Sequence, residues 1–365
     1  MRLLLSARQH GWHPAAWRVA EGPVFATSAL LDLARRAEQA GFDAVLFGQP
    51  ALPDAAPCDG REERLHLDAL PLMGAAIATT ARIGLGGHWP FDVAEPFHVA
   101  RVLATLDHLS GGRAAWITGM SGADMLRRRY PYLPPLDDDA AARRAAELVE
   151  VAASLWDSWE DRGFVADQAS GLFADPARVH PILHEGPFFA VRGPLNVPRP
   201  VQGRPVIIHH DRGPGPLRRA IAPLADVILA DCPTQADARA LQDSLAAARH
   251  GGAPLLVISV MPVLAHSDAD AARRAQALDA LAPCRTPRFV GTPDGFAAVL
   301  SRWHDASACD GFDLRPAAVP QDLDLICERV LPMLGRAPFP PAAHPGATLR
   351  DRLGLQRPAS KFATA

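Results

Sequence analysis

The chain has 365 residues, of which 48% are hydrophobic and 21% charged, and its formal net charge is −3. This composition is typical of a globular protein with a sizeable core and excludes a disordered or fibrous chain. The lack of a basic surplus argues against nucleic acid or an acidic membrane as a partner. Because no apolar run reaches the ~20 residues of a membrane span and the first residues do not resemble a signal peptide, we expect a cytoplasmic protein.

Along the chain, amphipathic helical stretches alternate with short apolar runs, and a Gly or Asp separates them. Helices are expected at 28–40, 68–81 and 96–109, and strands at 3–6, 44–47, 83–86, 114–118, 205–209, 227–230, 255–261, 289–290 and 312–314. Strands separated by helices indicate a parallel α/β sheet. Eight or nine such units, in a chain longer than the ~250 residues typical of the fold, favour a TIM (β/α)8 barrel over a doubly wound open sheet.

Residues 121–202 interrupt this alternation. They begin with a Pro-rich connection, continue with an acidic run and a helix whose apolar stripe is Leu148, Ala152, Leu155 and Trp159, and end in a long irregular stretch. Loops of this length are usually functional covers or interface elements. We expect 121–202 to be an insertion after the fourth strand, within a single domain over residues 1–365, that packs across the barrel edge or mediates a homodimer.

Six sequence blocks carry a resemblance to a known family. They are GWHPAAWR at 11–18, HVARVLATLDHLSGGRAAW at 98–116, LWDSWED at 155–161, GPLNVPRPVQGRPV at 193–206, CDGFDL at 309–314 and ATLRDRLGL at 347–355. The chain resembles the nitrilotriacetate and dibenzothiophene-sulfone monooxygenases, a branch of the bacterial luciferase-like flavin monooxygenases. The resemblance implies a TIM barrel that takes reduced FMN (FMNH2) from a separate flavin reductase and oxygenates a small organic substrate.

The chain departs from the family at the strand ends, where the chemistry of a TIM barrel lies. After the second strand the family carboxylate is missing from 47–50, and after the third strand a hydroxyl-rich run is replaced by 88–93. In the fourth strand and just after it, 115–121 keep the family Trp and Ser but place an aliphatic residue where the family has a flavin-contacting amide. The long lid insertion that the family has before 290–293 is also missing.

The fifth strand differs most, because the Gln-Ala-Gly-Ser-Ser run that holds the FMN phosphate in the family is replaced by His209, His210, Asp211, Arg212 and Gly213. Asp211 would repel a phosphate, whereas Arg212 could pair with one bidentately, so the sequence permits either net sign of charge at this strand end. Because several of the family's side-chain hydrogen bonds to the flavin are missing at these strand ends, we expect FMN binding to be weak or absent.

Two roles are assigned to strand-end residues. His88 and His209 are the catalytic candidates, because a neutral imidazole can stabilise or deprotonate a peroxide near neutral pH. The candidate cofactor-binding residues are Thr118, Ser121, His210, Asp211, Arg212 and Gly213. Since side chains alternate along a strand, His209 and Asp211 are expected to face the barrel lumen and His210 the opposite side.

These observations lead to one principal hypothesis and two alternatives. The principal hypothesis is an FMNH2-dependent, two-component monooxygenase, an oxidoreductase whose partners are a small organic substrate and a flavin reductase. The first alternative is a family member with a degenerate flavin site that serves as a non-catalytic partner or binding subunit. The less favoured alternative is a metal site made by His88, His209 and Asp211, which resemble a two-His-one-carboxylate set. The cysteines are scattered and form no CxxC pair, so they indicate no zinc site. We assign no metal-binding residues.

Overall fold

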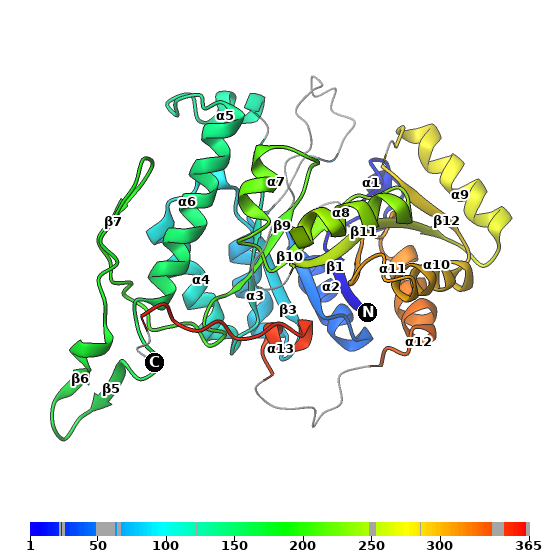
Figure 1. Ribbon diagram of the computed structural model, residues 1–365. Helices are drawn as coiled ribbons and strands as arrows, with labels where there is room; N and C mark the ends of the chain where they lie inside the picture. The colour runs from blue at the N-terminus through cyan, green and yellow to red at the C-terminus, as the bar shows by residue number, and fades with distance from the viewer. Residues whose placement is uncertain are drawn as a thin grey trace.

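The computed structural model describes residues 1–21, 23, 26–48, 63, 67–121, 123–247, 253–284, 286–337 and 347–362. Its centre is a closed barrel of eight parallel strands (Figure 1), as the alternating pattern predicts. The strands, in order around the barrel, are β1 (Arg2–Ser6), β2 (Ala44–Phe47), β3 (Gly84–His88), β4 (Ala114–Thr118), β9 (Val206–His210), β10 (Val227–Ala230), β11 (Leu255–Leu264) and β13 (Gly311–Leu314). β13 pairs with β1 and closes the barrel.

The helices cover the outside of the barrel. They are α1 (Ala16–Val19), α2 (Thr27–Ala40), α3 (Ala69–Thr79), α4 (Pro96–Ser110), α5 (Ala123–Arg129), α6 (Asp138–Asp157), α7 (Pro216–Ile221), α8 (Gln235–Ala247), α9 (Asp268–Leu281), α10 (Pro293–Asp305), α11 (Gln321–Leu325), α12 (Leu331–Met333) and α13 (Leu349–Leu353). α2 shows why the sequence folds this way locally: Leu30, Leu33, Ala34 and Ala37 form its buried stripe. The helix stops at Gly41, whose φ of 88° is left-handed and suits a residue without Cβ.

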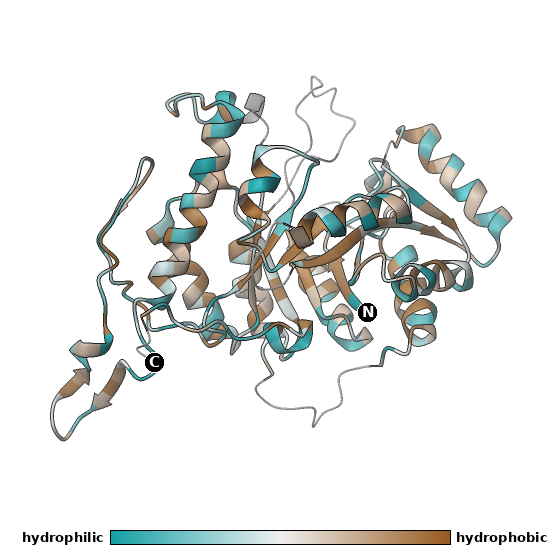
Figure 2. Ribbon diagram, in the orientation of Figure 1, coloured by the Kyte–Doolittle hydropathy of each residue, from teal (hydrophilic) through white to brown (hydrophobic). Residues whose placement is uncertain are grey.

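Most barrel strands divide their side chains between two apolar layers, whereas β3 and β13 contribute only to the outer one. Brown segments mark both the strands and the helix faces in Figure 2. Residues such as Leu3 and Leu5 point outward and pack against the helices. Leu4, Leu46 and Ile208 belong to a second cluster inside the barrel. Leu349 and Leu353 of α13 join this inner cluster, so the C-terminal helix closes the amino-terminal end of the barrel.

The ninth predicted strand lies outside the barrel. β12 (Arg288–Gly291) pairs only with the second half of β11, from Met261 to Leu264. The first half of β11 pairs with β10 and β13 and completes the barrel wall. The ten-residue length of β11 therefore explains why the sequence contains nine strand patterns for an eight-stranded barrel.

The chain between β4 and β9 combines a barrel helix with an extended arm. α6 packs against both α4 and α7, so it takes the place of an outer-layer helix. We expected Trp159 to belong to the apolar stripe of this helix, but α6 ends at Asp157. The Trp159 indole instead donates a hydrogen bond to the Leu195 carbonyl over 2.7 Å. The arm that follows carries two antiparallel pairs, β5 (Phe164–Asp167) with β6 (Leu172–Ala174) and β7 (His184–Glu185) with β8 (Ala190–Val191). Figure 1 shows the β5–β6 hairpin standing away from the barrel, whereas β7 lies against α6, where His184 Nε2 is 2.9 Å from Glu147 Oε1.

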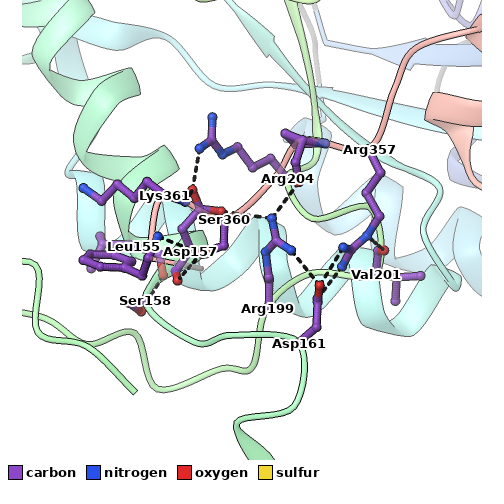
Figure 3. A network of polar contacts seen from close by, with 12 residues as sticks. Leu155, Asp157, Ser158, Asp161, Arg199, Val201, Arg204, Arg357, Ser360 and Lys361 are labelled. Atoms are coloured by element: carbon purple, nitrogen blue, oxygen red, sulfur yellow. Dashed lines mark hydrogen bonds and ion pairs between the residues drawn. The ribbon is translucent and has the colours of Figure 1, made fainter. Parts of the chain in front are cut away.

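The C-terminal tail holds the base of this arm through a charged network (Figure 3). Arg357 donates to both carboxylate oxygens of Asp161, over 2.8 and 2.6 Å. Arg199 donates to Asp161 and to the fully buried Asp157, and the backbone N–H of Lys361 donates to Asp157 as well. Among the described residues, no helix is both long enough and apolar enough to cross a bilayer.

Candidate functional site

The alternation of side chains determines which polar residues face the barrel lumen. In β9, Val206 and Ile208 lie in the inner apolar cluster, so His210 two residues later faces the carboxyl-terminal mouth of the barrel. In β10, Val227 and Leu229 are inner residues, and the same alternation brings Asp231 to the mouth. The mouth is therefore polar, although the barrel interior below it is apolar.

His209 faces the opposite way from our expectation. Its Nδ1 lies 3.1 Å from the Thr118 hydroxyl, and its ring stacks on Phe91 with 6.1 Å between the centroids. These contacts lie between the barrel wall and its outer layer, where the neighbouring Ile207 also packs. The expectation was wrong because His210, and not His209, continues the inward series that begins at Val206. His88, His209 and Asp211 thus form no metal site, and no group of three or more His, Cys, Asp or Glu that could hold an ion occurs in the described ranges.

A cavity of about 950 Å³ opens at the mouth. Four of the sequence-predicted residues line it: His210, Asp211, Arg212 and Gly213. The lining also contains residues that sequence reasoning missed, among them Arg8, Trp12, Asp231 and Arg315. Thr118, Ser121, His88 and His209 are not part of the lining. The structure therefore brings together the end of β9, the end of β10 and the loop after β13 around the cavity.

The cavity floor is organised around Arg315. Its Nε donates to Asp313 Oδ2 over 2.8 Å, its Nη1 donates to Asp231 Oδ1 over 3.3 Å, and its Nη2 lies 3.1 Å from His210 Nε2. The Ser259 hydroxyl donates to the same Oδ2 of Asp313 over 3.0 Å. Because a guanidinium only donates, Nε2 of His210 must be the accepting nitrogen.

Trp12 packs against two guanidinium groups of the cavity. The Arg315 guanidinium lies 4.7 Å from the indole centroid and that of Arg8 5.6 Å. The indole N–H donates to the Ser6 carbonyl over 2.9 Å, which fixes the ring at the end of β1. A detectable signal for Arg315 did exist in the sequence: in 311–315 charged residues alternate with Phe312 and Leu314, which places Asp313 and Arg315 on the lumen side.

The sequence suggested that Asp211 would repel a phosphate, but its carboxylate is paired within the protein. Arg218 of α7 binds it bidentately, with Nε to Oδ1 at 3.0 Å and Nη2 to Oδ2 at 2.5 Å. The pair is partly buried, so the carboxylate is neutralised within the protein. Beside it, Gly213 has a φ of 120° and open space where a Cβ would stand. The loop after β9 thus presents open backbone and the Arg212 side chain to the cavity.

Ser121 and His88, two further predicted residues, lie outside the cavity lining. Ser121 uses its backbone N–H, which donates to Asp92 Oδ1 over 2.9 Å. His88 follows Gly84 and Gly86 on the lumen side of β3, and its Nε2 is buried without a hydrogen-bond partner among the residues that the structure describes. Gln49 and Pro50, where the family carboxylate is missing, lie outside the described residues.

The three histidines are neutral near pH 7. Burial lowers the pKa of His88 and of His209 to about 4. Burial, followed by the nearby charges of Arg315 and Arg212, lowers the pKa of His210 to about 3. Neutral imidazoles at the mouth can donate or accept a hydrogen bond but carry no charge for a phosphate, so a phosphate would depend on the arginines of the lining.

The sequence and the fold were compared with known proteins, and the matches are to monooxygenases and to a synthase subunit. The family model described as luciferase-like monooxygenase matches residues 3–323. Dibenzothiophene-sulfone monooxygenase of Rhodococcus erythropolis is 30% identical over 82% of both chains, and one of the pristinamycin IIA synthase subunits of Streptomyces pristinaespiralis is 33% identical over 94% of both chains. The structure of EDTA monooxygenase from Chelativorans sp. BNC1 superposes with a TM-score of 0.84 at 25% identity and covers 98% of both chains.

These relatives differ in how they align with the chain. The alignment with dibenzothiophene-sulfone monooxygenase is 370 positions long yet covers only 82% of the 365 residues, so that relative has residues without a counterpart here. The alignment with the pristinamycin IIA synthase subunit is 343 positions long and covers 94% of each chain. The chain therefore aligns with the latter relative almost without interruption.

Proposed function

Because the chain belongs to the luciferase-like monooxygenase family, a family of oxidoreductases, we propose that it is the oxygenase component of a two-component monooxygenase that uses reduced FMN. The observation that carries the proposal is the cavity of about 950 Å³ at the carboxyl-terminal mouth of the barrel. This is where TIM-barrel enzymes hold their reacting groups. Its volume lies at the upper end of the usual range for small-molecule and cofactor sites.

The residues of the cavity fit a flavin in two respects. Nδ1 of His210 is a buried polar atom for which the described protein supplies no partner, so a ligand can supply one. Arg8 and Arg212 bring positive charge to the lining, and Gly213 leaves backbone space beside Arg212. We propose that Arg212 and Gly213 hold the phosphate and His210 a polar edge of the ring. When bound, the reduced flavin would activate dioxygen and supply one oxygen atom to the substrate.

The protein's own contribution is to bind, orient and exclude water. Arg218 neutralises Asp211, which removes the repulsion that a flavin phosphate would otherwise meet at the end of β9. Trp12 supplies an apolar ring on the same wall as the charged residues. His88 lies on the lumen side, and we retain it as a candidate for contact with the reacting oxygen. We no longer propose a catalytic role for His209, because its ring packs outside the barrel wall against Thr118 and Phe91.

The proposal is tested by isotope incorporation. The protein is supplied with FMN, NADH and a flavin reductase under 18O2, together with a panel of small organic sulfides and amines. We expect one 18O atom in the product of at least one compound, measured by mass spectrometry. The Arg212→Ala variant should lose most of this activity, whereas Arg35→Ala, an exposed substitution on α2, should retain it. Oxygenation that does not depend on Arg212 would contradict the assigned phosphate position.

One observation favours a second candidate function, that of a non-catalytic partner subunit. The relative that aligns almost without interruption is named as one subunit of a synthase, and another subunit of the same synthase is also similar, at 29% identity over 97% of this chain. We infer that the present chain would then pair with a longer homologue that carries the flavin. Co-expression with such a homologue and co-purification of a 1:1 complex, with flavin bound only to the homologue, would support this candidate over the first.

We also propose that the arm after α6 mediates association, either with a second copy or with that homologue. Phe173 is 68% exposed and Phe164 51% exposed, and their rings meet edge to face at 5.2 Å. A two-stranded hairpin is marginally stable alone in water, so a second surface over these rings would stabilise it.

A further inference from the structure

His210 differs from the other polar residues of the cavity because the protein determines which of its ring nitrogens carries the proton. Arg315 Nη2 lies 3.1 Å from Nε2 of His210 and can only donate. Nε2 is therefore the acceptor, and the proton of the neutral ring lies on Nδ1. Nδ1 is buried and has no hydrogen-bond partner in the described parts of the chain.

Arg315 is itself held in one position. Its Nε is bound to Asp313 and its Nη1 to Asp231, and its guanidinium packs over Trp12. Asp313 is completely buried and also accepts from Ser259, so the carboxylate is fixed from two strands. An arginine restrained on these sides keeps its third donor directed at His210 and cannot turn away when a ligand enters.

We propose that Arg315 acts as a positioning residue that holds His210 in the Nδ1–H tautomer, and that this N–H donates a hydrogen bond to an oxygen acceptor of the ligand in the barrel mouth. A buried donor without a partner costs free energy, and a ligand oxygen would remove that cost. The identity of the ligand as a flavin rests on the proposed function, whereas the tautomer does not.

The charges around His210 are consistent with a donor rather than a base. Arg315 from the loop after β13, Arg212 from the loop after β9, His88 from β3 and the adjacent His209 all disfavour an added proton, and burial disfavours it most. The carboxylates of Asp313 and Asp231 are bound to Arg315. To accept a proton, His210 would have to use Nε2, which requires the bond to Arg315 to break. Its role is therefore to donate from Nδ1.

The tautomer is tested by NMR on the full-length protein labelled with 15N-histidine. Protonated and unprotonated ring nitrogens give well-separated 15N resonances, and the His210→Phe variant assigns the pair. We expect Nδ1 protonated, Nε2 unprotonated, and no titration of His210 between pH 5 and pH 8. A proton on Nε2, or titration near the ordinary histidine pKa, would overturn the inference. The wild-type measurement does not depend on the folding of any variant at Arg315.

The role of Arg315 requires a variant that folds. Arg315→Met leaves the buried Asp313 unpaired, so the double variant Asp313→Asn with Arg315→Met removes both charges together. In this variant we expect an Nε2-protonated population of His210 to appear. Persistence of the pure Nδ1–H tautomer would show that Arg315 does not set it and would overturn the positioning role.

The donor role is tested with FMN as the probe. FMN addition should shift the Nδ1 resonance of wild-type His210, and His210→Phe should weaken FMN binding about 2- to 10-fold, as expected for one neutral hydrogen bond. His108→Phe is the matched control, because His108 lies at the end of α4 on the other face of the barrel and donates to, or accepts from, no cavity residue. FMN binding that leaves the Nδ1 resonance unchanged overturns the donor role and leaves the proposed function intact. Absence of FMN binding contradicts the proposed function and the donor role, but the tautomer remains a separate result.

Discussion

Arg350 and Asp226 form a buried bidentate ion pair under the amino-terminal end of the barrel, with Nη1 to Oδ1 at 3.0 Å and Nη2 to Oδ2 at 2.7 Å. Asp226 also accepts from the Ile207 backbone N–H at the start of β9, and Arg350 belongs to α13. One ion pair thus connects the helix that closes the barrel to the strand that ends at His210. β9 therefore carries a contact to this pair at its start and the cavity residue His210 at its end.

Removing one partner of this pair should destabilise the fold strongly. We expect Arg350→Met to lower the free energy of unfolding by about 3–5 kcal/mol, because it leaves the Asp226 carboxylate buried without its counter-charge. Arg35→Ala removes an exposed ion pair with Asp32 in α2 and should change stability by less than ~0.5 kcal/mol. Urea unfolding followed by circular dichroism measures both. Equal effects of the two variants would contradict the structural role of α13.

Stability should fall in mild acid because of the buried histidines. The folded-state pKa is about 4 for His88 and for His209 and about 3 for His210, below the value in the unfolded chain. The unfolded state therefore binds more protons between pH 6.5 and pH 4, so this stabilisation is complete above pH 6.5 and is lost as the pH falls. Each histidine should contribute a slope of up to about 1.4 kcal/mol per pH unit.

A variant isolates the slope of one histidine. His209→Asn should reduce the difference between the free energies of unfolding at pH 7 and pH 5, relative to wild type. Other titrating groups, including the buried Asp107 and Asp322, cancel in this comparison because both proteins contain them. An identical pH dependence in the two proteins would show that His209 is not buried in its neutral form.

Two glycines should respond in opposite directions to the same substitution. At Gly311, a Cβ would stand 2.2 Å from the Arg2 carbonyl oxygen, where β13 closes against β1. Gly311→Ala should therefore destabilise by about 3 kcal/mol or more. Gly74 lies inside α3 with only Leu106 Cδ2 nearby, at 4.0 Å, so Gly74→Ala should stabilise by about 0.5–1 kcal/mol. Thermal unfolding measures both, and a neutral Gly311→Ala would contradict the tight closure of the barrel.

The arm should control association. Phe173→Asp places a charge on the most exposed aromatic side chain of the arm and should shift the protein toward monomer in sedimentation velocity. Leu109→Asp is a suitable control, since Leu109 is 67% exposed but stands at the end of α4. If both variants and the wild type sediment alike, the arm does not mediate association under those conditions.

Most of the barrel was predictable because its signal is local. Each strand is a short apolar run and each helix has a stripe, as in α2, and these patterns require no knowledge of long-range contacts. β12 matched the same pattern but lies outside the barrel, because a strand pattern does not reveal which neighbour it pairs with. β12 pairs with the second half of β11, and the apolar run in the sequence does not show how far β11 extends.

The site was only partly predictable. The loop after β9 was identified, yet the direction of His209 and His210 was reversed, because a shift of one residue in a strand exchanges its two faces. The pairing of Asp211 with Arg218 and the bond from Arg315 to His210 depend on tertiary contacts, the second across 105 residues of sequence. The charge of a single loop therefore did not show that Arg218 neutralises Asp211.

The central claim, that the barrel mouth binds reduced flavin, is tested most directly by anaerobic titration of the purified protein with FMNH2, followed by calorimetry. We expect FMNH2 to bind saturably at one site. Oxidised FMN should bind more weakly, with a dissociation constant above ~1 μM. Arg212→Ala should bind FMNH2 about 10- to 100-fold more weakly than wild type, as expected for loss of a charge-assisted contact. No saturable binding of FMNH2, or equal binding by wild type and Arg212→Ala, would contradict the claim.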